Sequence, residues 1–174
     1  MKKTLPHRCL VLGGANSGKS AYAEKLCDES GLPKYYIATA QAFDDEMKAK
    51  IERHRARRGP EWLSVEAPLD LADAIAAAPA DAVVLLDCVT LWLSNQLLAG
   101  NDMTKACQDL HSALQDASAP IIVVSNEVGQ GIVPETSLGR RFRGLQGALN
   151  QDLAKQADRV VAVMAGLPLV LKEP

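Results

Sequence analysis

Gly13-Gly14-Ala15-Asn16-Ser17-Gly18-Lys19-Ser20 is the most informative stretch of this sequence. It matches the P-loop pattern, in which glycines let backbone N–H groups curl around a phosphate. Lys19 supplies a mobile positive charge for the β and γ oxygens, and Ser20 offers its hydroxyl to Mg²⁺. An apolar run at 9–12 precedes the motif and a helix-prone run at 21–26 follows it. The alternative, an ordinary glycine-rich turn, would not require this strand-and-helix context.

Length and composition fit a single nucleotide-binding domain over residues 1–174. The chain is 48% hydrophobic with a net charge of −2, and this near-neutral balance argues against nucleic acid as its main partner. No apolar run approaches the roughly 20 residues of a membrane span, and residues 1–7 lack the apolar core of a signal peptide. We therefore expect a cytoplasmic protein. Its four cysteines are widely spaced, so we expect reduced and mostly buried thiols rather than a zinc site or disulfides.

Short apolar runs alternate with helical patterns along the chain, as in a sheet built from βα units. The prediction is an α/β fold whose mostly parallel sheet is flanked by helices. A last strand at 168–171 follows a Gly-Leu-Pro break, which predicts a hairpin at the C-terminal edge. Helices are expected at 72–80, at 88–98, where Trp92 should lie in the core, and at about 136–157, while His111 should face solvent. The other predicted strands are 8–12, 35–39, 82–87, 120–125 and 159–164.

A basic cluster ends the helix that the sequence predicts between Asp44 and Gly59. Asp44 can cap this helix, and Gly59-Pro60 can stop it, which leaves Arg55, Arg57 and Arg58 in its last turn. These arginines either complement the helix dipole on a solvated face or hold a polyphosphate. His54 lies beside them and is either an ordinary histidine at a helix end or a catalytic one.

Two strand ends carry polar residues. Asp87 ends a buried apolar strand, where a Walker B carboxylate would hold Mg²⁺ beside Ser20, although apolar strands ending in Asp are common. Asn126-Glu127 ends another strand and leads into a loop with two glycines, which is either a ligand-binding loop or a plain connection. Three arginines downstream, Arg140, Arg141 and Arg143, either reach a phosphate or form a solvated face.

An ordered series of blocks accompanies these features from about Leu10 to Leu171. After the P-loop come Tyr36-Ile37-Ala38-Thr39-Ala40, Asp44-Asp45-Glu46-Met47, Ile51-x-x-His54-Arg55-x-x-Arg58, Leu85-Leu86-Asp87-Cys88-x-Thr90-Leu91-Trp92-Leu93-Ser94-Asn95 and Ser125-Asn126-Glu127-Val128-Gly129-x-Gly131-Ile132-Val133-Pro134. Together they resemble the bifunctional adenosylcobinamide kinase/adenosylcobinamide-phosphate guanylyltransferase family of cobalamin biosynthesis.

The resemblance implies a RecA-like P-loop fold, a homotrimer and two activities. One phosphorylates adenosylcobinamide with ATP or GTP; the other transfers GMP from GTP to that phosphate through a guanylylated histidine. The family's histidine falls on His54. Some relatives have a second histidine just before it, where this chain has Arg53. The resemblance further implies catalytic roles for His54 and Lys19, Mg²⁺ ligation by Ser20 and Asp87, and nucleotide contacts from Gly13, Gly14, Ala15, Asn16, Ser17, Gly18, Lys19, Ser20, Ala38, Thr39, Ala40, Arg55, Ala56, Arg57, Arg58, Glu66 and Asp87.

Two other classes of protein fit parts of the sequence. A small-molecule kinase of another kind would explain the P-loop without a covalent histidine intermediate, so it would keep its activity after His54→Ala. A RecA-like binding or regulatory module would respond to nucleic acid or protein, and the absence of an extended basic surface in the sequence argues against it.

Overall fold

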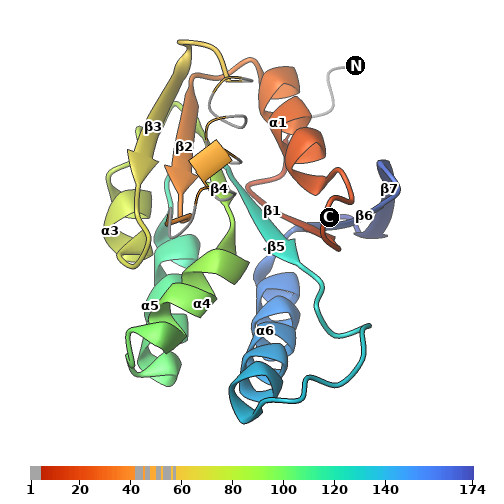
Figure 1. Cartoon of the computed structure of the whole chain (residues 1–174). Coiled ribbons are helices and arrows are strands. Elements are labelled where there is room, and N and C mark those ends of the chain that lie inside the picture. The colour runs from red at the N-terminus through yellow and green to blue at the C-terminus, as the bar shows by residue number, and fades with distance from the viewer. Residues whose placement is uncertain (1–4, 42–44, 46–47, 50–51, 53–55, 57) are drawn as a thin grey trace.

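A seven-stranded sheet forms the centre of the computed structural model, which describes residues 5–41, 45, 48–49, 52, 56 and 58–174 (Figure 1). Its strands are β1 (Arg8–Gly13), β2 (Lys34–Ala38), β3 (Trp62–Glu66), β4 (Val83–Asp87), β5 (Ile121–Asn126), β6 (Arg159–Met164) and β7 (Leu167–Lys172). They are arranged in the order β3-β2-β4-β5-β1-β6-β7. All neighbouring pairs are parallel except β6 and β7, which form an antiparallel hairpin at the C-terminal edge.

Helices cover the two faces of this sheet unequally. The helices are α1 (Lys19–Ser30), α3 (Leu71–Ala76), α4 (Val89–Leu98), α5 (Met103–Asp116) and α6 (Ser137–Gln156). Apolar side chains of α3, α4, α5 and α6 share one buried cluster with strand residues such as Leu10 and Leu86. Those of α1 share the other cluster, with the alternate strand residues such as Val11 and Leu85. Each central strand is thus buried on both faces, as its continuous apolar sequence requires.

Local signals set the helix boundaries. Gly31 ends α1 in the left-handed conformation, with φ of 69°. Asp102 caps α5 by accepting hydrogen bonds from the backbone N–H groups of Thr104 and Lys105. Thr136 caps α6 by accepting a hydrogen bond from the backbone N–H of Gly139 at 3.1 Å. The loops before these helices are therefore fixed by their first turns.

The register aligns the carboxyl ends of the parallel strands. Ala38 of β2 lies beside both Glu66 of β3 and Asp87 of β4. On the other side of β4, Gly13 of β1 lies beside Asn126 of β5. Several residues singled out by the sequence therefore meet along one edge of the sheet, where open α/β sheets bind ligands.

The α/β class, the five expected parallel strands and the C-terminal hairpin are confirmed. So are the long helix, the buried Trp92 and the four free cysteines, three of which are buried. The strand β3 was not predicted, because it is an edge strand whose mostly exposed residues lack a continuous apolar run. The predicted helix at 72–80 is shorter, since α3 ends at Ala76. The prediction that His111 faces solvent is wrong, because its ring is half-buried and Nδ1 lies 3.1 Å from Oε1 of Gln156 on α6.

Candidate nucleotide-binding and active site

The P-loop joins the end of β1 to the start of α1. Gly18 takes up a left-handed conformation, with φ of 93°, just before the helix begins at Lys19. The backbone N–H of Ser17 donates to the carbonyl of Gly14 at 3.3 Å, which closes the turn. Lys19 bends back over it, and its Nζ donates to the same carbonyl at 2.9 Å. The loop is thus curled as the motif predicts, with the ammonium group above it.

The β6–β7 turn supports the P-loop from the side. The backbone N–H of Gly166 donates to the carbonyl of Ser17 at 2.8 Å. A methyl group built on Gly13 would lie 2.6 Å from the carbonyl oxygen of Val163, so β6 also packs closely against the start of the loop. This support was not predicted, because the Gly-Leu-Pro break that begins at Gly166 indicates a hairpin but not what the hairpin contacts.

Asp87 ends β4 in the position of a Walker B carboxylate. The hydroxyl of Tyr36 donates to its Oδ2 at 3.4 Å. Burial and the Asp87 carboxylate raise the pKa of the neighbouring Cys88 thiol to about 11, and the positive charge of Lys19 opposes that rise. In the sheet, the end of β4 is separated from the end of β1, where the P-loop begins, by β5 alone. The Asp87–Cys88 peptide bond is cis.

Thr39 ties the ends of β2 and β4 together. Its buried hydroxyl donates to the carbonyl of Cys88 at 2.7 Å and accepts from the Cys88 backbone N–H at 2.9 Å. Its own carbonyl accepts a hydrogen bond from Nδ2 of Asn95 at 2.9 Å. Among the expected nucleotide contacts, Thr39 thus has a structural role at the edge where Ala38 and Glu66 lie.

The residues expected to hold Mg²⁺ offer suitable donors. Ser20 is half-buried in the first turn of α1, and α1 packs against the sheet face to which β4 contributes Leu85. A hydroxyl and a carboxylate are oxygen ligands of the kind that Mg²⁺ binds together with phosphate oxygens and water. No cluster of three or more His, Cys, Asp or Glu side chains suited to a metal occurs among the described residues. A metal at this edge would therefore depend on the nucleotide for part of its ligands.

The Arg58 guanidinium lies over the ring of Tyr36. Its Cζ is 3.4 Å from the centre of the Tyr36 ring, and its Nε and Nη1 are buried without a hydrogen-bond partner. Burial and Asp87 raise the pKa of Tyr36, while Arg58 lowers it. Of the basic cluster, Arg58 thus reaches the same tyrosine that contacts Asp87.

His54, Arg55 and Arg57 lie outside the described residues, as do most of the residues of the helix that the sequence predicts there. Ala56 is described and exposed. Their expected roles therefore stay predictions.

Side chains from two helices hold the end of β5. The backbone N–H of Asn126 donates to Oγ1 of Thr90 at 2.7 Å, and its carbonyl accepts from Nδ2 of Asn150 at 3.0 Å. Ser125 donates to Oδ1 of Asn150 at 2.6 Å, and Gln146 donates to the Ser125 hydroxyl at 2.9 Å. This buried network fixes Asn126 beside the P-loop.

Two of the three downstream arginines hold the loop between β5 and α6. Arg140 donates to the carbonyls of Pro134 and Glu135 at 3.0 and 2.6 Å. Arg143 donates to the carbonyl of Gly129. These contacts fit neither a purely solvated face nor a phosphate site, the two alternatives that the sequence left open.

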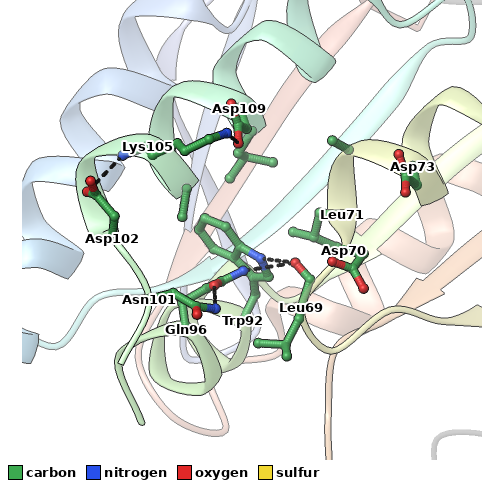
Figure 2. Close-up of a pocket in the computed structure, with 13 residues that line it drawn as sticks. Leu69, Asp70, Leu71, Asp73, Trp92, Gln96, Asn101, Asp102, Lys105 and Asp109 are labelled. Atoms are coloured by element: carbon green, nitrogen blue, oxygen red, sulfur yellow. Dashed lines mark hydrogen bonds and ion pairs between the residues drawn. The ribbon is translucent and has the colours of Figure 1, made fainter. Parts of the chain in front are cut away.

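A hollow of about 450 Å³ lies among α3, α4 and α5 and is lined by no P-loop residue (Figure 2). On its floor, the indole N–H of Trp92 and Nε2 of Gln96 both donate to the carbonyl of Leu69 at 2.9 Å. Lys105 forms an ion pair with Asp109 on its rim at 2.5 Å. The Trp92, Gln96 and Lys105 groups of this hollow thus already have partners, and none of the residues predicted to bind the nucleotide lines it.

No helix within the described ranges is both long and apolar enough to cross a membrane.

Known proteins resemble this chain over nearly its whole length. The family described as cobinamide kinase / cobinamide phosphate guanyltransferase matches residues 9–171. The bifunctional adenosylcobalamin biosynthesis protein CobP of Pseudomonas aeruginosa is 46% identical over 168 residues, which cover 95% of this chain and 97% of CobP. CobU of Escherichia coli, with the same description, is 41% identical over 179 residues, which cover 94% of this chain and 98% of CobU.

Solved structures show the same fold at low identity. The flagellar accessory protein FlaH of Methanocaldococcus jannaschii superposes with a TM-score of 0.57 at 13% identity, covering 98% of this chain and 80% of FlaH. The type III secretion ATPase EscN of enteropathogenic E. coli superposes with a TM-score of 0.58 at 11% identity, covering 92% of this chain and 43% of EscN. These likenesses confirm the RecA-like P-loop fold that the family resemblance implies. The chain belongs to the cobinamide kinase / cobinamide phosphate guanyltransferase family.

Proposed function

We propose that this chain phosphorylates adenosylcobinamide with ATP or GTP and then transfers GMP from GTP to the product through a guanylylated His54. The observation that carries the proposal is that the curled P-loop, with Lys19 Nζ bonded to the Gly14 carbonyl, follows β1 at the same edge of the sheet where β4 ends in Asp87. Family membership supplies the substrate class.

In the kinase step, the hydroxyl oxygen of the aminopropanol group attacks the γ-phosphorus. The bond between that phosphorus and the β–γ bridging oxygen breaks, the nucleoside diphosphate leaves, and the hydroxyl proton passes to solvent. The P-loop N–H groups and Lys19 hold the transferred phosphoryl group and balance its charge. Mg²⁺ bound by Ser20 and Asp87 would neutralise further charge on the β and γ oxygens.

In the transferase step, a neutral imidazole nitrogen of His54 attacks the α-phosphorus of GTP, and pyrophosphate leaves. A phosphate oxygen of adenosylcobinamide phosphate then attacks the same phosphorus, which frees His54 and yields adenosylcobinamide-GDP. Arg55, Arg57 and Arg58 would balance charge on the triphosphate. The unpartnered Nε and Nη1 of Arg58 support this role, because buried N–H donors favour an acceptor.

We further propose a homotrimer in the cytoplasm. The trimer follows from the resemblance, and the exposed apolar side chains of β7 offer a surface for a second subunit. The four free cysteines fit a reducing compartment.

Labelling with GTP that carries its label on the α-phosphate tests the covalent intermediate. We expect acid-labile, alkali-stable label on the wild type and none on His54→Ala. His111→Ala is the matched control, since His111 lies on α5 against Gln156, and it should keep the label. GTP labelled on the γ-phosphate should leave the protein unlabelled. Label retained by His54→Ala would reject the intermediate, and an intact kinase step without any label would favour a P-loop kinase of another kind.

A further inference from the structure

Arg58 and Asp87 carry opposite charges and contact the same side chain, Tyr36. The guanidinium lies on the face of the ring, with Cζ 3.4 Å from its centre, and the ring hydroxyl donates to Oδ2 of Asp87 at 3.4 Å. Among the ion pairs of the described residues, none joins Arg58 to Asp87 directly. Tyr36 therefore contacts a cation with its ring face and an anion with its hydroxyl, two charges that attract each other.

The Tyr36 ring has little freedom to move. It is only 4% exposed and packs in the cluster on the α1 face of the sheet. Trp62 of β3 meets it edge-on, with ring centres 6.1 Å apart and an interplanar angle of 85°. A ring held in this way is a rigid platform for a planar guanidinium, which stacks well on aromatic faces.

The stack leaves hydrogen-bonding capacity on Arg58 unused. Its Nε and Nη1 are buried without partners, and buried donors of a charged group are costly when they stay unpaired. Phosphate oxygens match the fork of N–H groups that a guanidinium presents. The Tyr36 hydroxyl meanwhile engages only one of the two carboxylate oxygens of Asp87.

We propose that Tyr36 is a positioning residue for the nucleotide: it holds Arg58 beside Asp87 without letting the two neutralise each other. The guanidinium then stays available for the phosphates of GTP, and the carboxylate stays available at the edge of the site. The inference rests on the proposed function, because it takes a nucleoside triphosphate as the ligand of this edge. Without the ring, Arg58 would approach Asp87, and both groups would be lost to the ligand.

Calorimetric titration with GTP and Mg²⁺ can distinguish the contribution of the Tyr36 ring face to GTP binding from that of its hydroxyl. Tyr36→Phe keeps the aromatic face, and we expect its Kd for GTP within about twofold of the wild type. Tyr36→Leu removes the face and should weaken binding by about tenfold, or about 1.4 kcal/mol. Tyr35→Leu is the matched control: Tyr35 is the neighbouring tyrosine of β2, equally buried at 4%, but it belongs to the cluster on the opposite face. It should bind GTP like the wild type.

A double variant tests whether Tyr36 acts through Arg58. If it does, Tyr36→Leu combined with Arg58→Ala should bind GTP no more weakly than Arg58→Ala alone. Losses that multiply in the double variant, or a Tyr36→Phe variant as weak as Tyr36→Leu, would overturn the proposal.

The NMR signal of the Arg58 Nε–H group provides a second measurement on the wild-type protein, which is needed if Tyr36→Leu does not fold. Ring current from Tyr36 should shift this signal in the free protein, and saturating GTP should move it further. An unmoved signal at saturation would overturn the proposal. Failure of the wild type to bind GTP would instead reject the proposed function, whereas a wild type that binds while Tyr36→Leu binds equally well would reject only the role of Tyr36.

Discussion

At Gly13 the backbone of the phosphate-binding loop passes close to two neighbours. A methyl group there would lie 2.3 Å from Oγ of Ser17 and 2.6 Å from the carbonyl oxygen of Val163. The serine could rotate, but the Val163 carbonyl belongs to β6 and cannot move without disturbing the sheet. At Gly14, by contrast, a methyl group would meet no atom within 4 Å.

We therefore expect Gly13→Ala to lower the free energy of unfolding by about 1–3 kcal/mol through overpacking. The matched variant Gly14→Ala should change it by less than about 0.5 kcal/mol. Urea unfolding at equilibrium measures both. Equal stability of the two variants would show that β6 yields to the added methyl group.

At the scale of single residues, the sequence predicted where a residue lies better than what its side chain binds. Lys19 and Asp87 stand where the P-loop and the strand pattern placed them, because those motifs encode local backbone geometry. Thr39 was expected at the nucleotide, yet its hydroxyl binds the backbone of Cys88. The contact between Tyr36 and Arg58 could not be predicted, since it joins a strand to the end of a separate segment and no spacing rule relates the two.

At the scale of elements, β5 depends on helices that follow and precede it in the chain. Thr90 of α4 accepts the backbone N–H of Asn126, and Asn150 of α6 binds the carbonyl of the same residue. Side chains of two helices thus bind both backbone polar groups of Asn126, the last residue of β5. The position of the strand end beside Gly13 then follows from the packing of α4 and α6.

Thr90→Val should break one half of this arrangement while preserving the shape of the side chain. The Asn126 N–H would lose its acceptor, and we expect a loss of about 1–3 kcal/mol in the free energy of unfolding. Native-state hydrogen exchange should show faster exchange at the Asn126 amide. The exposed Thr104 of α5 provides the control, because Thr104→Val should leave both measurements unchanged. Unchanged exchange at Asn126 in Thr90→Val would contradict the role given to Thr90.

Which elements the sequence predicted depended on how they are buried. Continuous apolar runs predicted β4 and β5, because strands covered on both faces have no polar side. The edge strand β3 was not predicted, because its mostly exposed residues form no continuous apolar run. The loop after β5 was recognised as unusual, but its attachment through Arg140 and Arg143 depends on where α6 begins in space and not on the loop sequence.

At the scale of the whole molecule, the two edge strands of the sheet, β3 and β7, are exposed to different extents. Lys34 of β2, the strand beside the β3 edge, lies 5.2 Å from the Trp62 ring centre and pairs with Glu61 at 3.6 Å. Every residue of β7 at the opposite edge is exposed, including Leu167 at 72%, Leu169 at 63% and Leu171 at 59%. The β6–β7 turn also binds Ser17 of the P-loop, so whatever contacts this hairpin lies next to the nucleotide-binding loop.

An unpaired edge strand with exposed leucines is a natural surface for a second copy of the chain. If the proposed trimer uses it, Leu169→Glu should place a charge in the interface and shift the protein to the monomer, as measured by light scattering after size-exclusion chromatography. Leu98→Glu is the matched control, because Leu98 is similarly exposed at 64% but lies at the end of α4, and this variant should assemble like the wild type. Circular dichroism should show that both variants remain folded, since neither side chain contributes to the buried clusters. A trimer that survives Leu169→Glu would place the subunit contacts elsewhere, whereas a wild-type monomer would reject the trimer itself.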